Sequence, residues 1–378
     1  MTKKKILVLT DHMPWGHRSI AKAIFNYLKE NKNEDFEIYY AEIKSKTGPA
    51  GDLYVFTYRY LPASNRLAHK ISRNQIVKDL IEKSSEVNLP LIKKEVERIK
   101  PDLIISAYFF HTHSLARWRE ETGQKFKLWT VATDPWTINP IMFVKGVDLF
   151  LVYDEIGQQE ALNAGIKIEN IVQTGWWVRP EMYQKYDRNK IRKNLGFNDD
   201  RPIIFVGGGS LGTNSITKLL PILFSLKTKV GFVFNTGTDK LVYNLVNQYI
   251  KMFRQLRKDD LVQIKHLGWI ENIAEVLSAC DMVFGKAGPN FLFDVMACQK
   301  PFVAITHIGG QEDGNIDLIK KKNLGWVKEK NEELVNFLFK YLKDPKIYQN
   351  KFLENIKKEA ELNQKSLPKI LELIKKES

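Results

Sequence analysis

The sequence contains little cysteine and no long apolar run. Its 378 residues include two cysteines, Cys280 and Cys298, which are too few for a disulfide framework and cannot form a zinc site on their own. No stretch of about 18 apolar residues predicts a transmembrane helix, and the apolar run before Asp11 is too short for the core of a signal peptide. We therefore expect a protein that is not secreted, not stapled by disulfides and not membrane-spanning.

Several sequence motifs are also missing. The chain has no Asp-x-Asp sequence, no phosphate-loop lysine motif and no zinc-finger spacing. The net charge of +14 suits nucleic acid, an anionic membrane or a phosphorylated ligand. However, the basic residues are mixed with acidic ones, and dense runs such as residues 320–322 are typical of solvated helix faces. Because no aromatic RNA-binding signature occurs either, we do not expect nucleic acid to be a partner.

What the chain does have is a regular alternation of short apolar runs and longer amphipathic segments. Buried, β-branched strands that alternate with helices predict parallel sheets covered on both faces. A stretch at 176–200, which contains Pro180 and a run of charged residues, separates two such series. We predict an α/β protein with domains at 1–185 and 186–345, followed by helices at 346–378 that pack back toward the first domain. The expected strands are 6–10, 36–41, 103–106, 126–131, 149–153 and 171–174 in the first series, and 203–206, 230–234, 262–266, 282–284, 302–305 and 326–328 in the second.

Each predicted sheet begins with a strand that runs into a turn. The first turn covers residues 11–18 and precedes a helix from Ser19; the second covers residues 207–213, is rich in glycine and precedes a helix from about Asn214. Ligands of open parallel sheets lie beyond the carboxyl ends of the strands. A glycine-rich turn at that edge brings backbone N–H groups and a helix N-terminus close to a phosphate. A tight strand–helix turn that needs positive φ also explains the glycines.

A dinucleotide site would need an acidic residue at the end of the next strand to bind the ribose. In the second domain that strand ends at residues 235–237, which read Asn-Thr-Gly and contain no acid. The first domain offers Glu42, but its turn lacks the three-glycine spacing. The sequence therefore disfavours a dehydrogenase.

The most informative stretch is residues 285–315, which reads as strand, glycine-rich turn, helix, strand, glycine-rich turn and helix. Because neighbouring parallel strands share a direction, both turns open at the same edge of the sheet. Asp294 lies one turn into its helix, where a carboxylate can accept ribose hydroxyls; a favourable acid in the first helical turn is the alternative. The second turn carries amide and carboxylate groups that suit sugar hydroxyls or, alternatively, a helix cap, namely Gln311, Glu312 and Asn315.

Taken in order, these motifs resemble those of the monogalactosyldiacylglycerol synthases and the bacterial processive diacylglycerol glucosyltransferases, and more distantly those of MurG. The resemblance covers most of the chain. It implies a B-type glycosyltransferase fold, in which two Rossmann-like domains face each other across a cleft. It also implies an inverting transfer of a hexose from a UDP-sugar to a lipid acceptor such as diacylglycerol. The motifs that carry it are residues 16–18, 179–180, 207–209, 286–289 with Asp294, and 310–315.

Two alternatives to this activity stay open. One is a UDP-sugar epimerase on the same fold, which would use water and no acceptor. The other is a non-catalytic member that binds nucleotide-sugar or lipid. An assay without acceptor separates the first from a transferase.

We expect the second domain to hold the UDP-sugar, with the diphosphate over its glycine-rich turns. The ribose would meet Asp294, and the sugar ring would meet Gln311 and Glu312. Because no Asp-x-Asp sequence occurs, we expect no metal and no cofactor, and backbone N–H groups and helix termini would stabilise the charge of the leaving diphosphate. The remaining predicted donor-binding residues are Gly208, Gly209, Ser210, Lys286, Ala287, Gly288 and Asn315.

The acceptor hydroxyl must lose its proton to a base as it attacks the sugar. His17 and Asp134 both follow strand ends of the first domain, and the ordinary pKa of histidine, about 6.5, suits the task. The resemblance instead favours Asp134 as the base and places His17 at the donor phosphates or the acceptor. A helix-start position for His17 and a turn acid before proline for Asp134 are the alternatives. Asp11 and His12 are reserve candidates.

The sequence departs from the resembled family at several positions. Residues 13–15, Met-Pro-Trp, stand where the family has glycines, and Asp294 stands where it has the longer glutamate. Asn139 replaces a histidine and Met142 replaces a tryptophan. Because an amide cannot carry a proton as imidazole does, these last two changes bear on the acceptor rather than on the donor.

Residues 52–70 interleave aromatic rings with basic side chains. This mixture suits the headgroup interface of a membrane, where rings lie at the polar boundary and cations meet anionic lipid. We therefore expect a cytoplasmic protein that attaches peripherally to the anionic inner face of the cell membrane. The alternative is core packing, because residues 54, 58 and 61 share one helical face. The residues assigned to acceptor or membrane binding are Tyr54, Phe56, Arg59, Tyr60 and Asn139.

Overall fold

The computed structural model describes residues 3–13, 16–31, 34–44, 66–67, 69–71, 73–74, 79, 82–207 and 214–377. The chain divides into two compact units, each built from separate stretches of sequence. The first unit comprises Met1–Val178, Ile308–Gly314 and Leu362–Ser378, and the second comprises Arg179–His307 and Asn315–Glu361. The chain therefore passes from the first unit to the second after Val178, where the sequence prediction had placed the boundary after residue 185.

The first unit contains a six-stranded parallel sheet in the order β2-β1-β3-β4-β5-β6. Its central strands are apolar almost throughout, since helices cover both faces of a parallel sheet; all four residues of β3 are buried. The strands are β1 (Lys4–Asp11), β2 (Phe36–Ile43), β3 (Leu103–Ser106), β4 (Lys127–Val131), β5 (Leu149–Val152) and β6 (Ile171–Gln173). The helices are α1 (Gly16–Asn31), α5 (Leu89–Ile99), α6 (Phe109–Thr122), α7 (Glu155–Asn163) and α17 (Ser366–Lys376), with the 3₁₀ turns η1 (Ser85–Asn88), η2 (Pro140–Met142) and η3 (Ile168–Asn170).

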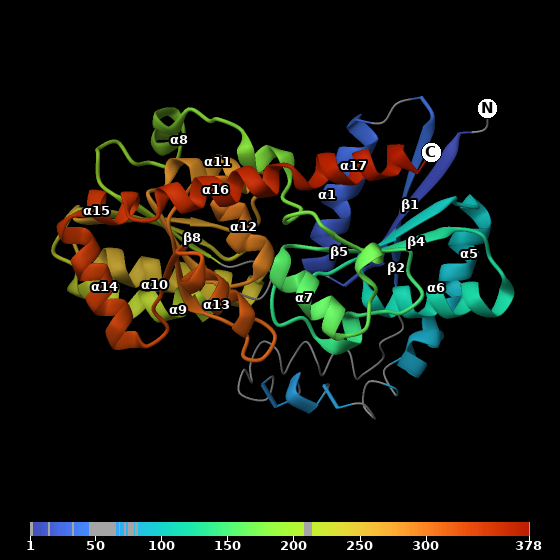
Figure 1. The fold of residues 1–378 in the computed structure, drawn as a ribbon. Coiled ribbons are helices and arrows are strands. Elements are labelled where there is room, and N and C mark those ends of the chain that lie inside the picture. Colours follow the sequence, from blue (N-terminus) through green and yellow to red (C-terminus); the bar gives the residue numbers. More distant parts are fainter. Residues whose placement is uncertain are drawn as a thin grey trace. The chain divides into compact units, whose positions relative to one another are not determined.

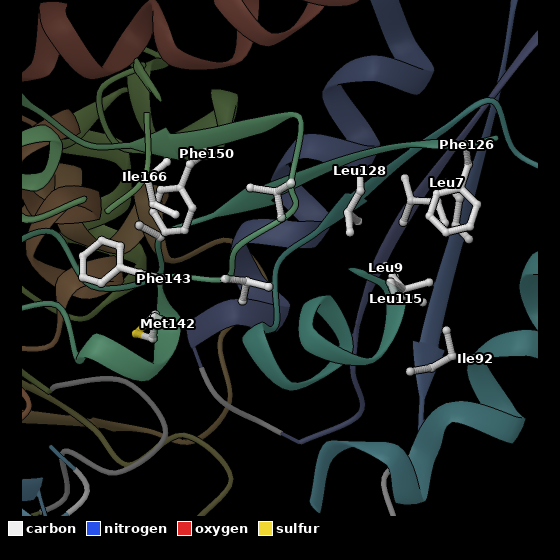
Figure 2. Packing of buried hydrophobic residues seen from close by; sticks show 14 of the residues in the cluster. Leu7, Leu9, Ile92, Leu115, Phe126, Leu128, Met142, Phe143, Phe150 and Ile166 are labelled. Atoms are coloured by element: carbon white, nitrogen blue, oxygen red, sulfur yellow. The ribbon is translucent and has the colours of Figure 1, made fainter. Parts of the chain in front are cut away.

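The core of the first unit lies between this sheet and helices α5 and α6. Figure 2 shows Leu7 and Leu9 of β1 close to Leu115 of α6, with Ile92 of α5 nearby. All four side chains are fully buried. The sheet and these helices therefore fix the position of the carboxyl ends of β1 and β3.

The C-terminal helix α17 packs on the first unit. Figure 1 shows it, in red, alongside α1 in blue. Asn363, just before α17, accepts a hydrogen bond from the backbone N–H of Trp176 at 2.8 Å, and Ser366 Oγ donates to the Trp176 carbonyl at 2.8 Å. These bonds tie the end of the chain to the segment where the first unit ends.

The second unit contains another six-stranded parallel sheet, in the order β12-β11-β10-β7-β8-β9. Helices α9, α10 and α14 supply the apolar residues on one face, and Figure 1 shows α11, α12 and α16 on the other. The strands are β7 (Ile203–Gly207), β8 (Val230–Asn235), β9 (Val262–Leu267), β10 (Met282–Lys286), β11 (Phe302–Thr306) and β12 (Gly325–Val327). The helices are α8 (Arg188–Asn194), α9 (Asn214–Leu219), α10 (Lys240–Leu256), α11 (Ile273–Ala279), α12 (Pro289–Ala297), α13 (Asp313–Lys321), α14 (Asn331–Lys343), α15 (Pro345–Asn350) and α16 (Leu353–Gln364), with η4 (Pro180–Tyr183) and η6 (Leu220–Ser225).

The predicted α/β fold class and all the predicted strands are confirmed. In each sheet the strand order reverses once, between β1 and β3 in the first and between β7 and β10 in the second. Ligands of such sheets bind at the carboxyl ends of the strands beside the reversal. We therefore expect a functional site at the carboxyl ends of β1 and β3 or of β7 and β10.

Candidate active site

Beside the reversal of the first sheet lies a buried cluster of polar side chains. Thr10 and Asp11 end β1, His17 is the second residue of α1, and His111 lies in the first turn of α6. His111 Nε2 lies 3.5 Å from a carboxylate oxygen of Asp11, and both side chains are fully buried. His17 Nδ1 lies 3.0 Å from Thr10 Oγ1, and its ring lies 4.5 Å from that of Tyr108 between centroids. The structure thus brings together His17 and the reserve candidate Asp11.

Burial controls the charge of the two histidines. It lowers the pKa of His17 to about 4, and the carboxylate of Asp11 opposes this shift. Burial also lowers the pKa of His111, again against the effect of Asp11. Both imidazoles are therefore neutral near pH 7. A neutral imidazole beside a buried carboxylate can accept a proton, because the carboxylate stabilises the resulting cation.

The second predicted base, Asp134, is buried in the loop that follows β4. Helix α7 holds this loop: Asp154 accepts hydrogen bonds from the indole N–H of Trp136 at 3.1 Å, and Glu160 accepts from the backbone N–H of Thr137 at 3.0 Å. Thr137 has φ of 56°, a strained value for a β-branched residue that persists only where the surroundings impose it. The loop that carries Asp134 is therefore fixed by two hydrogen bonds to α7 and its N-cap residue.

The remaining sequence candidates in the first unit have other partners. His12 contacts Glu42, with Nδ1 lying 3.3 Å from the carboxylate, and its side chain is largely exposed. Asn139 caps η2 by accepting the backbone N–H of Ile141 at 3.2 Å. Met142 is buried in the hydrophobic core. The two positions that depart from the resembled family thus fill a capping role and a packing role.

At the edge of the second sheet, Lys286 ends β10 and is buried. The backbone N–H of Ala287 donates to the Thr306 carbonyl at 2.9 Å, so it already has a partner within the sheet. Gly288 is the N-cap residue of α12, with Pro289 next to it at the start of the helix. The groups offered to an anion here are the N-terminus of α12 and the ammonium group of Lys286.

Asp294 lies beyond the first turn of α12, which contains no acidic residue. The structure therefore removes the alternative of a favourable first-turn acid. One carboxylate oxygen accepts a hydrogen bond from the Arg179 guanidinium at 3.0 Å. Burial raises the pKa of Asp294, and Arg179 opposes the shift. Arg179 Nε and the hydroxyl of Tyr183 are buried without a hydrogen-bond partner among the described residues. The ion pair therefore lies beside polar atoms that can still form hydrogen bonds.

The turn after β11 is held by its own side chains. Glu312 accepts the backbone N–H of Ile308 at 2.8 Å and is buried. Asn315 donates to the Ala287 carbonyl at 2.8 Å, while its side-chain oxygen is buried without a partner among the described residues. Gln311 and Glu312 belong to the first compact unit and Asn315 to the second. Asn315 thus joins the turns that follow β10 and β11.

Two family models match separate parts of the chain. Residues 17–178 match the family model of monogalactosyldiacylglycerol (MGDG) synthase. Residues 203–374 match the glycosyltransferase family 28 C-terminal domain. The chain is thus similar to MGDG synthases in its first part and to family 28 glycosyltransferases in its second part. The first match begins at His17, within the buried cluster, and the second contains the turns that follow β10 and β11.

Relatives of this family are similar along most of the chain. The MGDG synthase of Spinacia oleracea chloroplasts is 24% identical over 351 residues, which is 91% of this chain and 64% of the relative. The processive diacylglycerol beta-glucosyltransferase of Bacillus pumilus is 23% identical over 350 residues, which is 91% of this chain and 88% of the relative. The chain therefore spans about two thirds of the length of the plant enzyme and most of the bacterial one.

Among solved structures, MurG of Acinetobacter baumannii has a similar fold. It aligns with a TM-score of 0.62 and 14% identity over 99% of both chains. This likeness confirms the predicted two-domain α/β fold, which is similar to that of MurG.

Some predicted site residues lie outside the residues that the structure describes. They are Gly208, Gly209 and Ser210 of the turn after β7, and Tyr54, Phe56, Arg59 and Tyr60 of the proposed membrane segment. Within the described part of the chain, no group of three or more metal-ligating side chains is found. No described helix is long and apolar enough to cross a membrane.

Sequence reasoning missed His111. The signal was present, because this histidine follows the strand at 103–106 by five residues, in the turn beside the reversal of strand order. What was lacking was the order of the strands. Only the pairing of β1 with β3 places the start of α6 next to Asp11.

Proposed function

We propose that this protein is a glycosyltransferase that moves a hexose from a UDP-sugar to a diacylglycerol-type lipid with inversion at the anomeric carbon. The observation that carries the proposal is the buried cluster of His17, Asp11 and His111 beside the strand reversal of the first sheet. It lies in a chain whose relatives are named as MGDG synthases and as a diacylglycerol glucosyltransferase. A cluster of this kind supplies what the reaction needs, which is a neutral base in a water-poor environment.

The reaction is a single displacement. The acceptor hydroxyl oxygen forms a bond to C1 of the sugar while the bond from C1 to the diphosphate oxygen breaks. The hydroxyl proton passes to His17, and UDP leaves with the bonding electrons. The carboxylate of Asp11 favours the protonated form of His17, so it stabilises the charge that appears on the imidazole. Asp134 is the second candidate for this proton.

Residues at the carboxyl edge of the second sheet and in the turn after β11 supply the donor contacts in this proposal. The N-terminus of α12 and Lys286 stabilise the charge that develops on the diphosphate. Asp294, held by Arg179, accepts the ribose hydroxyls, and Asn315 presents its unpartnered oxygen to the donor. Gln311 and Glu312 bind the sugar ring. These groups need no metal ion to act.

Calorimetric titration with UDP in buffer that contains EDTA tests the donor part. We expect binding without added metal. Absence of binding, or binding that appears only when magnesium is restored, would contradict the proposal.

A panel of UDP-hexoses, incubated with the protein and detergent-dispersed diacylglycerol, tests the transfer. We expect one UDP-hexose to give a glycolipid, with release of one UDP for each sugar transferred. A parallel incubation without acceptor looks for a new free or nucleotide-bound sugar, which would indicate an epimerase instead. UDP binding without any turnover on the panel would indicate a non-catalytic member.

A further inference from the structure

Helix α10 has two apolar faces, although only one of them packs against the protein. The helix connects β8 to β9 in the second unit and is labelled in Figure 1. Val246, Ile250 and Phe253 face the sheet and are buried in the core of this unit. These residues account for the folding of α10, so any further apolar side chains on it need another explanation.

A second face of α10, about 120° around the helix from the buried face, carries an exposed apolar stripe. Leu241 is 68% exposed, Leu245 46%, Met252 43% and Leu256 69%. With about 100° of rotation for each residue, these four positions fall within roughly 60° of one another on the helix surface. Phe224 of η6 borders this stripe, because its ring is 40% exposed and lies 5.9 Å between centroids from that of Tyr249, which is next to the stripe on the helix surface. Five large apolar side chains therefore share one exposed surface.

The charge of α10 has one sign. Its 17 residues include Lys240, Lys251 and Arg254 and no aspartate or glutamate. Helix α5 of the first unit is a useful contrast, because its exposed side mixes Lys94 and Glu97 as solvated helices usually do. An exposed apolar stripe beside basic residues, without acids, is typical of helices that lie in the interface of an anionic membrane.

We propose that the α10 face, defined as Phe224, Leu241, Leu245, Met252 and Leu256 with the basic residues of α10, binds the surface of an anionic phospholipid bilayer. The apolar side chains enter the boundary between headgroups and acyl chains, and Lys240 and Lys251 meet the lipid phosphates. A second copy of the chain fits this face less well. In a two-fold dimer the same basic residues would face one another, and like charges repel. The proposal concerns an interaction surface and stands whether or not the chain transfers sugar.

Flotation of the full chain with vesicles tests the surface directly. The vesicles contain phosphatidylcholine with or without about a third of phosphatidylglycerol, at low salt. We expect binding to the anionic vesicles and weak binding to the neutral ones. Replacing Leu245, Met252 and Leu256 together with serine is expected to weaken vesicle binding about tenfold or more, because their apolar area no longer enters the bilayer.

A matched control replaces three equally exposed apolar residues elsewhere, Val87, Ile168 and Ile347, with serine. This variant is expected to bind vesicles like the unmodified chain. A second pair of variants separates charge from apolar insertion. Lys240→Gln with Lys251→Gln is expected to lower binding to anionic vesicles only, whereas Lys94→Gln with Lys340→Gln has no effect.

The residues at 52–70 are a separate candidate for membrane contact, so the Phe56, Arg59 and Tyr60 to serine variant is measured alongside. We call the chain with serine at positions 245, 252 and 256 the stripe variant. Unchanged flotation of the stripe variant overturns the proposal for α10, whatever the Phe56, Arg59 and Tyr60 to serine variant does. Failure of the unmodified chain to bind anionic vesicles also overturns it. A dimer that the stripe variant converts to monomer in sedimentation shows that a second copy occupies the face, which likewise overturns it. UDP binding by the stripe variant is expected to be unchanged, so loss of the membrane surface and loss of the proposed activity remain distinguishable.

Discussion

At the reversal of strand order, the first unit buries two histidines and a carboxylate, and the second places a helix N-terminus, small residues and a lysine. Asp11, His17 and His111 are all buried beside the end of β1. At the corresponding edge of the second sheet, Lys286 ends β10, alanine and glycine follow it, and Asp294 of α12 pairs with Arg179. The two sheets share one architecture and differ in the chemistry of this edge.

Under the proposed function, the difference matches what each half of a glycosyl transfer requires. Deprotonation of an acceptor needs a side chain whose charge can change, and burial beside a carboxylate tunes such a side chain. Binding of a diphosphate needs donors that approach closely and do not titrate, which helix termini and small residues provide. We call the carboxyl ends of β1 and β3 the first edge and those of β7 and β10 the second edge. If this division of roles holds, substitutions at the first edge alter turnover and substitutions at the second edge alter affinity for UDP.

The largest effect is expected at the first edge. His17→Gln removes the proposed base while keeping a polar side chain of similar length. We expect kcat to fall roughly 10²-fold or more, with affinity for UDP within about twofold of the unmodified protein. The measurement is steady-state transfer to dispersed diacylglycerol together with calorimetry.

His12→Gln is the matched control, because His12 is exposed and contacts Glu42 instead. It is expected to leave kcat unchanged. Asp134→Asn is measured beside it. A loss for Asp134→Asn that exceeds the loss for His17→Gln assigns the proton to Asp134, and a near-normal kcat in both variants contradicts the division between the edges.

At the second edge, two glycines lie opposite each other where β7 meets β10. Gly285 pairs with Gly207 in the sheet, and a Cβ atom at Gly285 would lie 2.3 Å from the Gly207 carbonyl oxygen. Because the nearest atom is a backbone oxygen, which cannot rotate away as a side chain can, Gly285→Ala is expected to push β7 and β10 apart. We expect a loss of stability of about 1–3 kcal/mol and a weaker affinity for UDP by roughly tenfold.

Gly268→Ala is the control for Gly285→Ala. A Cβ atom there would meet its nearest neighbour at 3.4 Å, which is ordinary contact. Thermal unfolding and UDP titration compare the two variants. Equal stabilities would show that β7 and β10 separate without cost.

A smaller effect is expected for the ion pair beside α12. Arg179→Lys keeps the positive charge but loses the planar guanidinium that holds Asp294. We expect affinity for UDP to fall by roughly fivefold to tenfold while kcat at saturating donor changes little. A fall in kcat alone would place Arg179 in the chemistry of the transfer and break the comparison between the edges.

The sequence predicted the strands because buried parallel strands appear as short apolar runs. The run at 103–106 coincides with β3, all of whose residues are buried. The order of the strands, which determines where the order reverses, was not predicted. The turn residues Lys286, Gly288 and Asn315 could be singled out because glycines and amides interrupt these runs.

Contacts between distant residues were not predictable in the same way. Arg179 and Asp294 are 115 positions apart, and nothing in the spacing of either residue indicates the other. His111 meets Asp11 only because β3 pairs with β1. The hydrogen bond by which Asn139 caps η2 was not predicted either, and the assignment of Asn139 to the acceptor stays a prediction. Local sequence patterns predict helices and strands. Contacts between side chains that are far apart in the sequence depend on how these elements pack, which local patterns do not show.

The prediction with the smallest expected effect on transfer near pH 7 concerns the pH dependence of stability, which the comparison assigns to the first edge. Burial lowers the pKa of His17 from 6.5 to about 4. Between these values the unfolded chain binds a proton at His17 and the folded chain does not. Stability is therefore fully present above pH 6.5 and is lost as the pH falls toward 4, by about 1 kcal/mol for each pH unit. The buried His111 acts in the same direction.

His17→Gln is expected to reduce this acid sensitivity, because the variant has no imidazole at position 17 to protonate on unfolding. Urea unfolding of the unmodified chain, His17→Gln and His12→Gln at about pH 7 and about pH 5 measures it. We expect the unmodified chain and His12→Gln to lose the same stability between the two conditions and His17→Gln to lose less. If all three chains lose equal stability, His17 is not held neutral by burial. The first edge would then lack the tuned base on which its contrast with the second edge depends.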